Sequence, residues 1–411
     1  MNTAAQYAKR KLIGLVNRFR VLFLGLSSHP VFRRMENDLR FFHDATEIFF
    51  QETLDAAVSR NRPGTFSRNS PGIGVYGYDD TNLPRLANHA KRVLLPEEVD
   101  EFVSIDVAFI WGHAAHKGNV ATLCKALPQH ATIVLCEDGF IKSADTWANR
   151  NIPEKYRRGC SLLMDTKGFH FDATVPTNLE DMLNDRSLLV SQEEREHARN
   201  MIRKIVDNRI TKYNHQPMRT IDVGRPGKRK VLVVDQSYGD FSILRGWADE
   251  STFASMLQSA IVENPDADIL VKTHPDTMAG ARKGYYDNVK EEGNVYRVTI
   301  PVNPYSLMDL VDKVYVCSTQ FGLEALLAGK EVHVFGMPFY AGWGLTVDAQ
   351  ENPRRTNTRS LEELFHIFYV RYTNWLNPET GEEWTIDQAV DHMISLRSDY
   401  SEYRQRQNGT K

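Results

Sequence analysis

The second half of the chain repeats one pattern, in which a short apolar run is followed by a polar cluster and then by an amphipathic stretch. The apolar runs are Lys230–Val234, Asp268–Lys272, Lys313–Val316 and residues 331–335. The amphipathic stretches are residues 251–262, 307–311 and 320–327. Strands that alternate with helices are typical of a parallel α/β layer structure. We therefore predict an open α/β domain with ligands bound at the carboxyl ends of its strands.

The first half carries a less regular version of the same pattern. Ile73–Tyr76, Val107–Trp111 and residues 132–136 read as buried strands, residues 81–92 and 119–127 as helices, and residues 193–208 as a long charged helix. A length of 411 residues accommodates two α/β domains. We predict a first domain over residues 1–218, a Gly-, Pro- and Arg-rich linker over 219–229, a second domain over 230–352, and an aromatic-rich, mostly helical segment over 353–411 that packs back on the first domain.

The composition is that of an ordinary globular protein. Fifty basic and 53 acidic residues give a net charge of −3, which argues against a nucleic-acid partner. The four cysteines lack disulfide or zinc spacing and favour the cytoplasm. No apolar run is long enough to span a membrane. Basic residues interleaved with apolar ones in the first twenty positions predict a helix that covers the first domain or, alternatively, makes peripheral contact with the inner membrane.

Two of the polar clusters are acidic. Glu137 and Asp138 follow the predicted strand 132–136, and repulsion between adjacent carboxylates would raise one pKa into the range of a general acid or base. The alternative is an acidic turn. Asp235 opens the cluster after Lys230–Val234, where a carboxylate can act as a nucleophile or stabilise an oxocarbenium-like centre. Gly239 in that cluster permits close backbone approach to a ligand, and the alternative is a turn that caps the next helix.

The other two clusters favour anion binding. Pro275 keeps His274 out of helical geometry, so the imidazole is expected to project from the strand end beside Lys272 and to hold a phosphate or carboxylate. The alternative is a structural histidine. Ser318 and Thr319 precede a predicted helix whose free N–H groups can seat a phosphate, or the hydroxyls act only as helix caps. Together the four clusters indicate transfer from a nucleotide sugar.

Several segments resemble one family, the retaining β-Kdo glycosyltransferases of bacterial capsule and O-antigen polysaccharide biosynthesis. The matching motifs span residues 105–348 and are C-E-D-G-F-I-K-S at 136–143, S-L-L-M-D at 161–165, V-V-D-Q at 233–236, V-K-T-H-P-D at 271–276, S-T at 318–319 with 322–330, and P-F-Y-A-G-W-G-L-T at 338–346. The acid-acid-Gly and His-Pro pair also resembles bacterial sialyltransferases. In the family, an Arg usually stands where this chain has Lys142.

The resemblance implies a GT-B-like α/β fold, with two Rossmann-like domains facing a central cleft. The first domain would serve the acceptor and the second would bind CMP-Kdo, without a cofactor or catalytic metal. Retention of configuration implies double displacement through a covalent adduct. Asp235 would be the nucleophile, and either Glu137 or Asp138 the acid/base.

The resemblance also implies a set of donor-binding residues. His274 and Lys272 would bind the phosphate or the sugar carboxylate, and Ser318 and Thr319 the phosphate, with Glu324 on the ribose. The full donor-binding set that we predict is Gln236, Gly239, Lys272, His274, Pro275, Ser318, Thr319 and Glu324. Tyr340 and Trp343 would stack on sugar or cytosine, unless they are packing residues of a Gly-rich turn.

The predicted function is transfer of Kdo from CMP-Kdo to a glycan or glycolipid acceptor of the bacterial surface, in the cytoplasm or at the inner membrane face. A transferase for another CMP-linked keto sugar, such as a sialic acid, is the nearest alternative, and a metal-independent UDP- or GDP-sugar transferase is a further one. A catalytically inert glycan-binding assembly subunit is the alternative outside the enzymes. The carboxylates at Asp235, Glu137 and Asp138 favour an enzyme.

Overall fold

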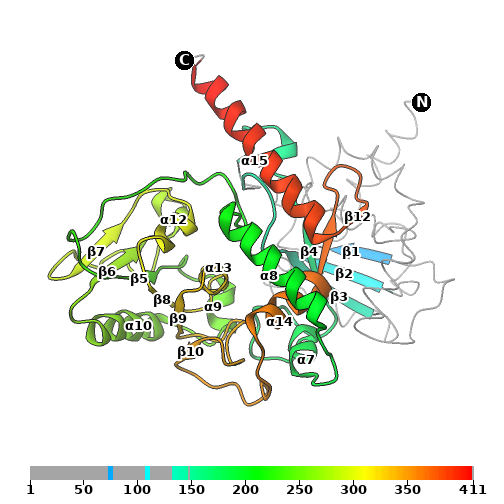
Figure 1. Ribbon diagram of the computed structural model, residues 1–411, viewed down its shortest axis with the longest axis horizontal. Helices are drawn as coiled ribbons and strands as arrows, with labels where there is room; N and C mark the ends of the chain where they lie inside the picture. The colour runs from blue at the N-terminus through cyan, green and yellow to red at the C-terminus, as the bar shows by residue number, and fades with distance from the viewer. Residues whose placement is uncertain (1–72, 77–106, 112–131, 147–148, 410–411) are drawn as a thin grey trace, which may run out of the picture. The chain divides into compact units, whose positions relative to one another are not determined.

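A computed structural model of the chain describes residues 73–76, 107–111, 132–146 and 149–409. They divide into two compact units (Figure 1). The first unit holds the described residues up to Phe169 together with Thr373–Ala389. The second holds His170–Tyr372 and the remainder of the chain from Val390. The domain boundaries predicted from the sequence remain a prediction.

The first unit is built on a mixed six-stranded sheet in the order β1-β2-β3-β4-β11-β12. Its strands are β1 (Ile73–Tyr76), β2 (Val107–Trp111), β3 (Thr132–Asp138), β4 (Ser161–Asp165), β11 (Thr373–Leu376) and β12 (Glu383–Trp384). β1, β2 and β3 are parallel, whereas β4 runs antiparallel to both β3 and β11. The sheet therefore joins strands that lie more than two hundred residues apart in the sequence.

The second unit is built on a six-stranded sheet in the order β10-β9-β8-β5-β6-β7, and all its strand pairs are parallel. The strands are β5 (Lys230–Val234), β6 (Asp268–Lys272), β7 (Val295–Val298), β8 (Lys313–Val316), β9 (Glu331–Val334) and β10 (Val347–Asp348). Numbered along the chain from β5, the order is 3-2-1-4-5-6, as in dinucleotide-binding α/β folds. Strand order reverses between β5 and β8, and ligands of such sheets bind beyond the carboxyl ends at this point.

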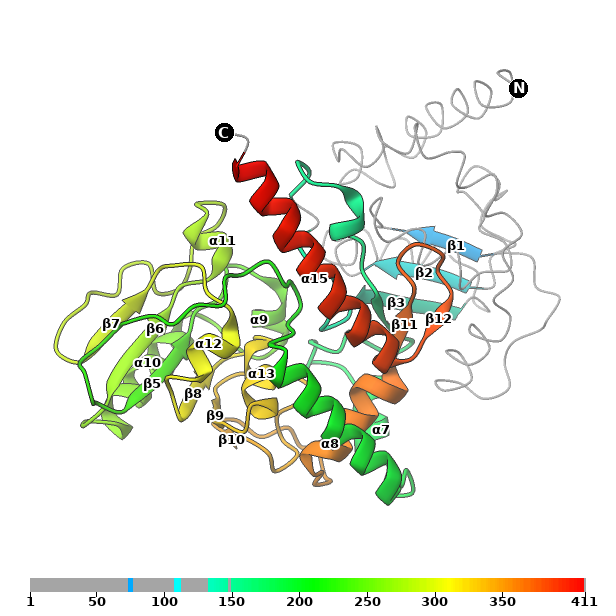
Figure 2. The ribbon, with the colours of Figure 1, turned by 45° about the horizontal axis from the view of Figure 1, so that its top comes forward.

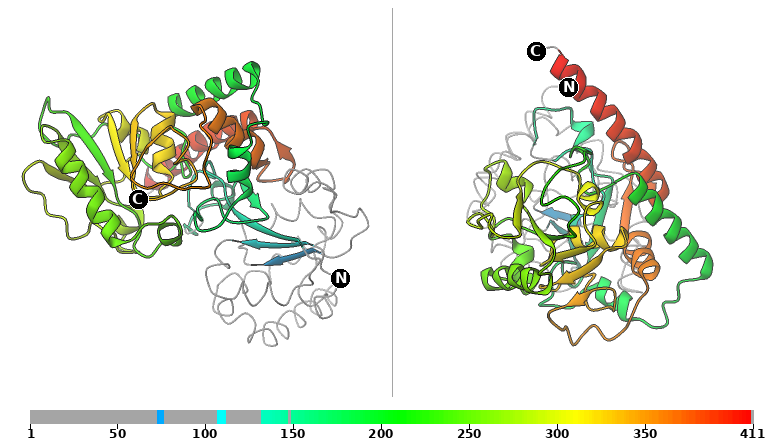
Figure 3. Two further views of the ribbon diagram at one scale, coloured as in Figure 1. Left: turned by 90° about the horizontal axis from the view of Figure 1, so that it is seen from below. Right: turned by 60° about the vertical axis from the view of Figure 1, so that its left-hand side comes forward.

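The core of the second unit explains why these apolar runs form strands. Residues on both faces of β5, β6 and β8 are buried, as expected of parallel strands covered by helices. On one face, Val231, Val233, Ile269 and Val271 pack in one cluster with Phe253 and Met256 of helix α10 (Glu250–Glu263). Figure 3 shows α10 lying along this sheet, and α10 begins at a capping box formed by Asp249 and Thr252.

The other helices of the second unit are shorter, apart from α8 and α15. Figure 2 shows α13 beside β8 and β9, with α12 next to α13. The helices are α7 (Asn178–Asn184), α8 (Gln192–Asp207), α9 (Phe241–Arg245), α11 (Pro275–Met278), α12 (Pro304–Met308), α13 (Phe321–Leu327), α14 (Leu361–Phe365), a π-helix (His366–Tyr372) and α15 (Ile386–Gly409). α15 begins in the first unit, which also contains a 3₁₀ turn over Glu154–Tyr156. No helix among the described residues has the length and apolar character needed to cross a membrane.

Most elements predicted from the sequence are present. Five predicted strands match β1, β2, β5, β6 and β8 residue for residue. The prediction differs by one residue at one end of α13 and β9, and by one residue at each end of α8 and α10. The helix predicted over 307–311 begins earlier, at Pro304, which suits the first turn of a helix. Residues 219–229 lack regular structure. The predicted helices 81–92 and 119–127, and the basic N-terminal segment, lie outside the described residues. The parallel α/β sheet is confirmed, and the arrangement of two domains about a cleft remains a prediction.

Candidate functional site

The carboxyl ends of β5 and β8 are joined by a reciprocal side-chain pair. The Gln236 side-chain NH₂ donates to Ser318 Oγ at 3.2 Å, and the Ser318 backbone N–H donates to Gln236 Oε1 at 3.0 Å. The two bonds fix the orientation of the amide, because its oxygen must face the N–H group. Gln236 is buried, and it therefore ties the two strand ends together at the point where the strand order reverses.

Asp235 is enclosed at the end of β5, with only 1% of its surface exposed. Its Oδ1 accepts the backbone N–H groups of Gln236 at 2.8 Å and Tyr285 at 2.9 Å, and its Oδ2 accepts that of Tyr286 at 3.4 Å. Burial raises the pKa of this carboxyl to about 6, against the lowering effect of these hydrogen bonds. Gly284 lies so close that a Cβ there would overlap the carboxylate. The carboxylate thus holds the loop 284–286 against β5.

Lys272 and His274 lie at the end of the neighbouring strand β6. The Lys272 ammonium donates to the Thr273 carbonyl at 2.7 Å, and burial lowers its pKa to about 8. His274 has extended backbone angles, as Pro275 predicts, and caps α11 by accepting the Asp276 N–H on Nδ1 at 3.2 Å. Two nitrogen groups from one strand end can therefore face an anion beyond the sheet.

The segment after β8 is less open than a phosphate seat requires. Thr319 accepts the N–H of Phe321 on its hydroxyl and that of Gly322 on its carbonyl, so these donors already have acceptors. Glu324 is buried in α13 and accepts from Gln320 at 3.1 Å, and burial raises its pKa to about 7. Thr319 thus accepts from the first turn of α13 although it precedes the N-cap residue, Gln320. The roles of Ser318, Thr319 and Glu324 in donor binding remain predictions.

Gly239 is required by backbone geometry. Its φ is +72°, in the left-handed region that other residues rarely adopt, and no atom lies near the position of a Cβ. The neighbouring Asp240 caps α9 by accepting the Ser242 N–H. Among the described residues, the geometry of the turn accounts for the glycine at this position. Close approach of a ligand to Gly239 remains a prediction.

Glu137 and Asp138 belong to the first unit, and the prediction that they follow the strand was wrong. β3 extends through both residues because β4 pairs with it as far as Asp138 and Leu162. Neighbouring strand residues point to opposite faces, so the two side chains diverge. Asp138 is buried and its Oδ2 pairs with the Lys142 ammonium at 2.5 Å, whereas Glu137 Oε1 accepts the Asp138 N–H at 2.9 Å. Asp138 is thus a buried carboxylate paired with a cation, and Glu137 is the more accessible carboxylate of the two.

Tyr340 and Trp343 are packing residues, and the stacking interpretation of their rings is not supported. Their exposed fractions are 1% and 0%. The Tyr340 hydroxyl donates to the Thr319 carbonyl at 2.6 Å, and the indole N–H of Trp343 donates to the Phe339 carbonyl at 2.7 Å. Both polar atoms are satisfied by nearby backbone, which leaves neither ring face open to a sugar or a base.

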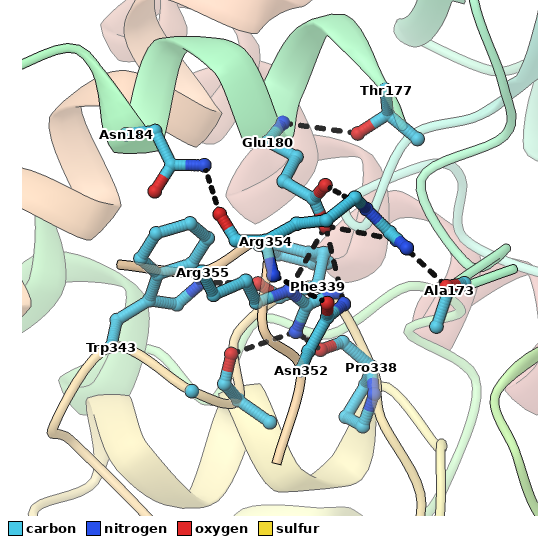
Figure 4. Close-up of polar contacts among 12 residues, drawn as sticks. Ala173, Thr177, Glu180, Asn184, Pro338, Phe339, Trp343, Asn352, Arg354 and Arg355 are labelled. Atoms are coloured by element: carbon cyan, nitrogen blue, oxygen red, sulfur yellow. Dashed lines mark hydrogen bonds and ion pairs between the residues drawn. The ribbon is translucent and has the colours of Figure 1, made fainter. Parts of the chain in front are cut away.

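A buried ionic cluster anchors this aromatic turn (Figure 4). Glu180 of α7 accepts from Arg354 Nε at 2.6 Å and from Arg355 Nε at 3.2 Å. Arg355 also donates to the carbonyls of Pro338 and Ala341. One carboxylate thus holds the turn that follows β9 against the helix α7 through the two arginines.

The sequence interpretation missed three features of the candidate residues, two in the second unit and one in the first. It assigned no role to Ser237, whose hydroxyl lies 3.0 Å from His274 Nδ1, to the loop 284–286, or to the pairing of Lys142 with Asp138. Only the last had a local signal, because the spacing of four residues places two opposite charges within reach. The loop follows no motif, and nothing in its sequence indicates that it surrounds Asp235.

Known proteins resemble the chain over most of its length. A family model described as "Capsule polysaccharide biosynthesis protein" matches residues 107–375. "Capsule polysaccharide modification protein LipA" of Neisseria meningitidis serogroup A is 35% identical over 85% of this chain and 49% of its own length. "Lipopolysaccharide-processing protein LpsZ" of Rhizobium meliloti is 35% identical over 62% of this chain and 57% of its own. The chain spans about half the length of these curated relatives.

Two solved structures share the fold. A structure titled "Thermosulfurimonas dismutans KpsC, beta Kdo 2,4 transferase" is 34% identical, with a TM-score of 0.70, and the match covers 80% of this chain and 99% of that one. A second, titled as the β-Kdo 2,7 transferase of the same KpsC, has 24% identity and a TM-score of 0.59, with 79% and 99% covered. The predicted family resemblance is thereby confirmed, and the chain belongs to the family of capsule polysaccharide biosynthesis proteins.

Proposed function

We propose that this chain transfers Kdo from CMP-Kdo to a glycan or glycolipid acceptor in capsule or lipopolysaccharide synthesis. The observation that carries the proposal is the arrangement at the carboxyl edge of the second sheet. Gln236 and Ser318 join β5 to β8, and Lys272 and His274 lie at the end of β6 beside them. A parallel sheet with this strand order binds nucleotides at this edge. The 34% identity to a solved β-Kdo 2,4 transferase supports Kdo as the sugar.

The charges at this edge suit a donor with two anionic groups. The Lys272 ammonium, whose pKa of about 8 keeps it largely protonated at neutral pH, provides a positive charge for the phosphate or the sugar carboxylate. His274 provides a second nitrogen. CMP-Kdo carries one phosphate and one carboxylate, and both would gain charge-assisted hydrogen bonds here.

The proposed mechanism is double displacement with retention of configuration. Asp235 would attack the anomeric carbon of Kdo as CMP leaves, and the acceptor oxygen would then displace Asp235 from the adduct while a carboxylate removes its proton. A pKa of about 6 leaves most of Asp235 ionised at neutral pH, as a nucleophile requires. Attack also requires the loop 284–286 to release the enclosed carboxylate.

Enclosure of Asp235 makes Asp138 the alternative nucleophile, with Asp235 then acting as the anchor of loop 284–286. Asp138 is also buried, and its carboxylate pairs with the Lys142 ammonium at the end of β3. In that case Glu137, which is the more accessible of the adjacent pair, would be the acid/base. The two assignments predict adducts on different tryptic peptides.

The test is intact-protein and peptide mass spectrometry after incubation with CMP-Kdo generated in situ. The parent chain should gain one Kdo mass, and Asp235→Asn should gain none. Asp138→Asn tests the alternative, and Asp249→Asn, at an exposed helix cap that asparagine also fills, is the matched control. An adduct that survives Asp235→Asn but not Asp138→Asn reassigns the nucleophile. If the parent fails to form an adduct or to bind CMP, and instead binds CMP-sialic acid or another sugar nucleotide, the proposal that CMP-Kdo is the donor is wrong.

A further inference from the structure

His274 Nδ1 is contacted by two hydrogen-bond donors at once. The backbone N–H of Asp276 lies 3.2 Å from it, and the Ser237 hydroxyl oxygen lies 3.0 Å from it. A backbone N–H can only donate, so Nδ1 must be the acceptor and must lack a proton. The hydroxyl, which can donate or accept, then has to donate as well.

This arrangement fixes the tautomer of the ring. A neutral imidazole without a proton on Nδ1 carries its proton on Nε2, and a charged imidazolium would turn an Nδ1–H group toward the Asp276 N–H. We propose that Ser237 is a positioning residue that, together with the Asp276 N–H, holds His274 as a neutral imidazole whose Nε2–H is presented to an anionic group of the sugar nucleotide. The identity of the ligand rests on the proposed function, whereas the tautomer does not.

The backbone around Ser237 makes its hydroxyl a fixed donor. Ser237 is 3% exposed and pairs with Gly284 in an isolated β-bridge, and its carbonyl accepts the Asp240 N–H at 3.1 Å. The hydroxyl therefore approaches the imidazole from a braced turn at the end of β5. The histidine comes from the end of β6, so the contact also sets the position of one strand end against the next.

Burial favours the neutral ring of His274 and is the largest influence on its pKa, which it lowers. The carboxylates of Asp276 and Asp240 raise this pKa, and the smaller effects of Lys272 and Arg282 lower it, but burial outweighs the charged groups. A neutral Nε2–H donor adds direction to anion binding without adding charge. Lys272 then supplies the positive charge that attracts the anion, and His274 supplies a directed hydrogen bond. Such a site has one cation rather than two.

The first test reads the tautomer directly in the full chain. Long-range ¹H–¹⁵N correlation spectra of protein with ¹⁵N-labelled histidine distinguish the two tautomers and the imidazolium, and His274→Gln identifies the signal. We expect the Nε2–H tautomer at neutral pH in the parent and in Ser237→Thr, and loss of the single tautomer or a raised pKa in Ser237→Ala. An Nδ1–H tautomer or an imidazolium in the parent overturns the proposal.

The second test measures CMP binding by calorimetry. Ser237→Ala should weaken binding by about three- to tenfold, the effect of one lost hydrogen bond, and Ser237→Thr should restore it. Ser242→Ala is the matched control, since its hydroxyl donates to Asp240 in the same turn. Unchanged tautomer and affinity in Ser237→Ala refute the positioning role. The predicted tautomer in a parent chain that binds no CMP supports the role of Ser237 and refutes the proposed donor instead.

Discussion

Replacement of Asp235 by asparagine tests whether burial of this carboxyl in its ionised form lowers the free energy of unfolding. Burial raises its pKa from 3.8 to about 6, and about two pKa units correspond to roughly 3 kcal/mol. The folded carboxyl binds a proton more tightly than the unfolded one. The resulting stabilisation is therefore complete below pH 3.8 and is lost as the pH rises through about 6. Asparagine is neutral throughout, and its oxygen can still accept the N–H groups of Gln236 and Tyr285.

The measurement is urea unfolding of the parent and Asp235→Asn at about pH 4.5 and about pH 7.5. Between these values the parent should lose about 2 kcal/mol of unfolding free energy relative to the variant, which is some two thirds of the full effect. Asp249→Asn is the control, because hydrogen bonds lower the pKa of that exposed carboxyl and its effect has the opposite sign. An identical pH dependence in the parent and Asp235→Asn would refute the burial argument.

Three further predictions concern the residues around the site. CMP affinity should fall as the pH rises through about 8 because Lys272 then loses its charge, and calorimetry of Lys272→Met should show weak binding without this step. Glu180→Gln leaves Arg355 buried without a counter-charge, and it should lower the unfolding free energy measured in urea by about 3–5 kcal/mol. Glu196→Gln, which removes a charge from an exposed ion pair, should lower it by less than about 1 kcal/mol. Trp343→Phe should cost on the order of 2 kcal/mol but leave the donor KM unchanged, and a several-fold rise in KM with unchanged stability would restore the stacking interpretation.

The sequence predicts the second sheet well because its signals are local. Lys230–Val234 and Asp268–Lys272 are continuous apolar runs between polar flanks, as strands buried on both faces must be. β7 (Val295–Val298) was missed because its two central residues are only partly buried and one is charged. β4 and β11 depend on pairing between segments two hundred residues apart, which leaves no periodic signal in either strand.

The same distinction applies to the candidate site. The meeting of Gln236 with Ser318 follows from the rule that parallel strands end at one edge, so the sequence can predict it. Two of the N–H donors to Asp235, those of Tyr285 and Tyr286, come from the irregular loop 284–286, which a sequence pattern does not place. Tyr340 and Trp343 were ambiguous because an aromatic ring with a polar atom suits both a ligand and a packed turn, and only the backbone acceptors decide between them.

The antiparallel pairing of β4 with β11 makes the segment His170–Tyr372, which is the larger part of the second unit, an insertion within the first unit. Thr373 lies opposite Leu163, so the chain leaves the first sheet after β4 and returns to the neighbouring position, after the whole of His170–Tyr372. A truncation before Thr373 would therefore not trim an appendage. It would remove β11 from one side of β4 and leave β4 as an unprotected sheet edge, and such edges recruit other chains. Shortened versions of this protein should aggregate, and a circular permutant that keeps β11 beside β4 should stay monodisperse.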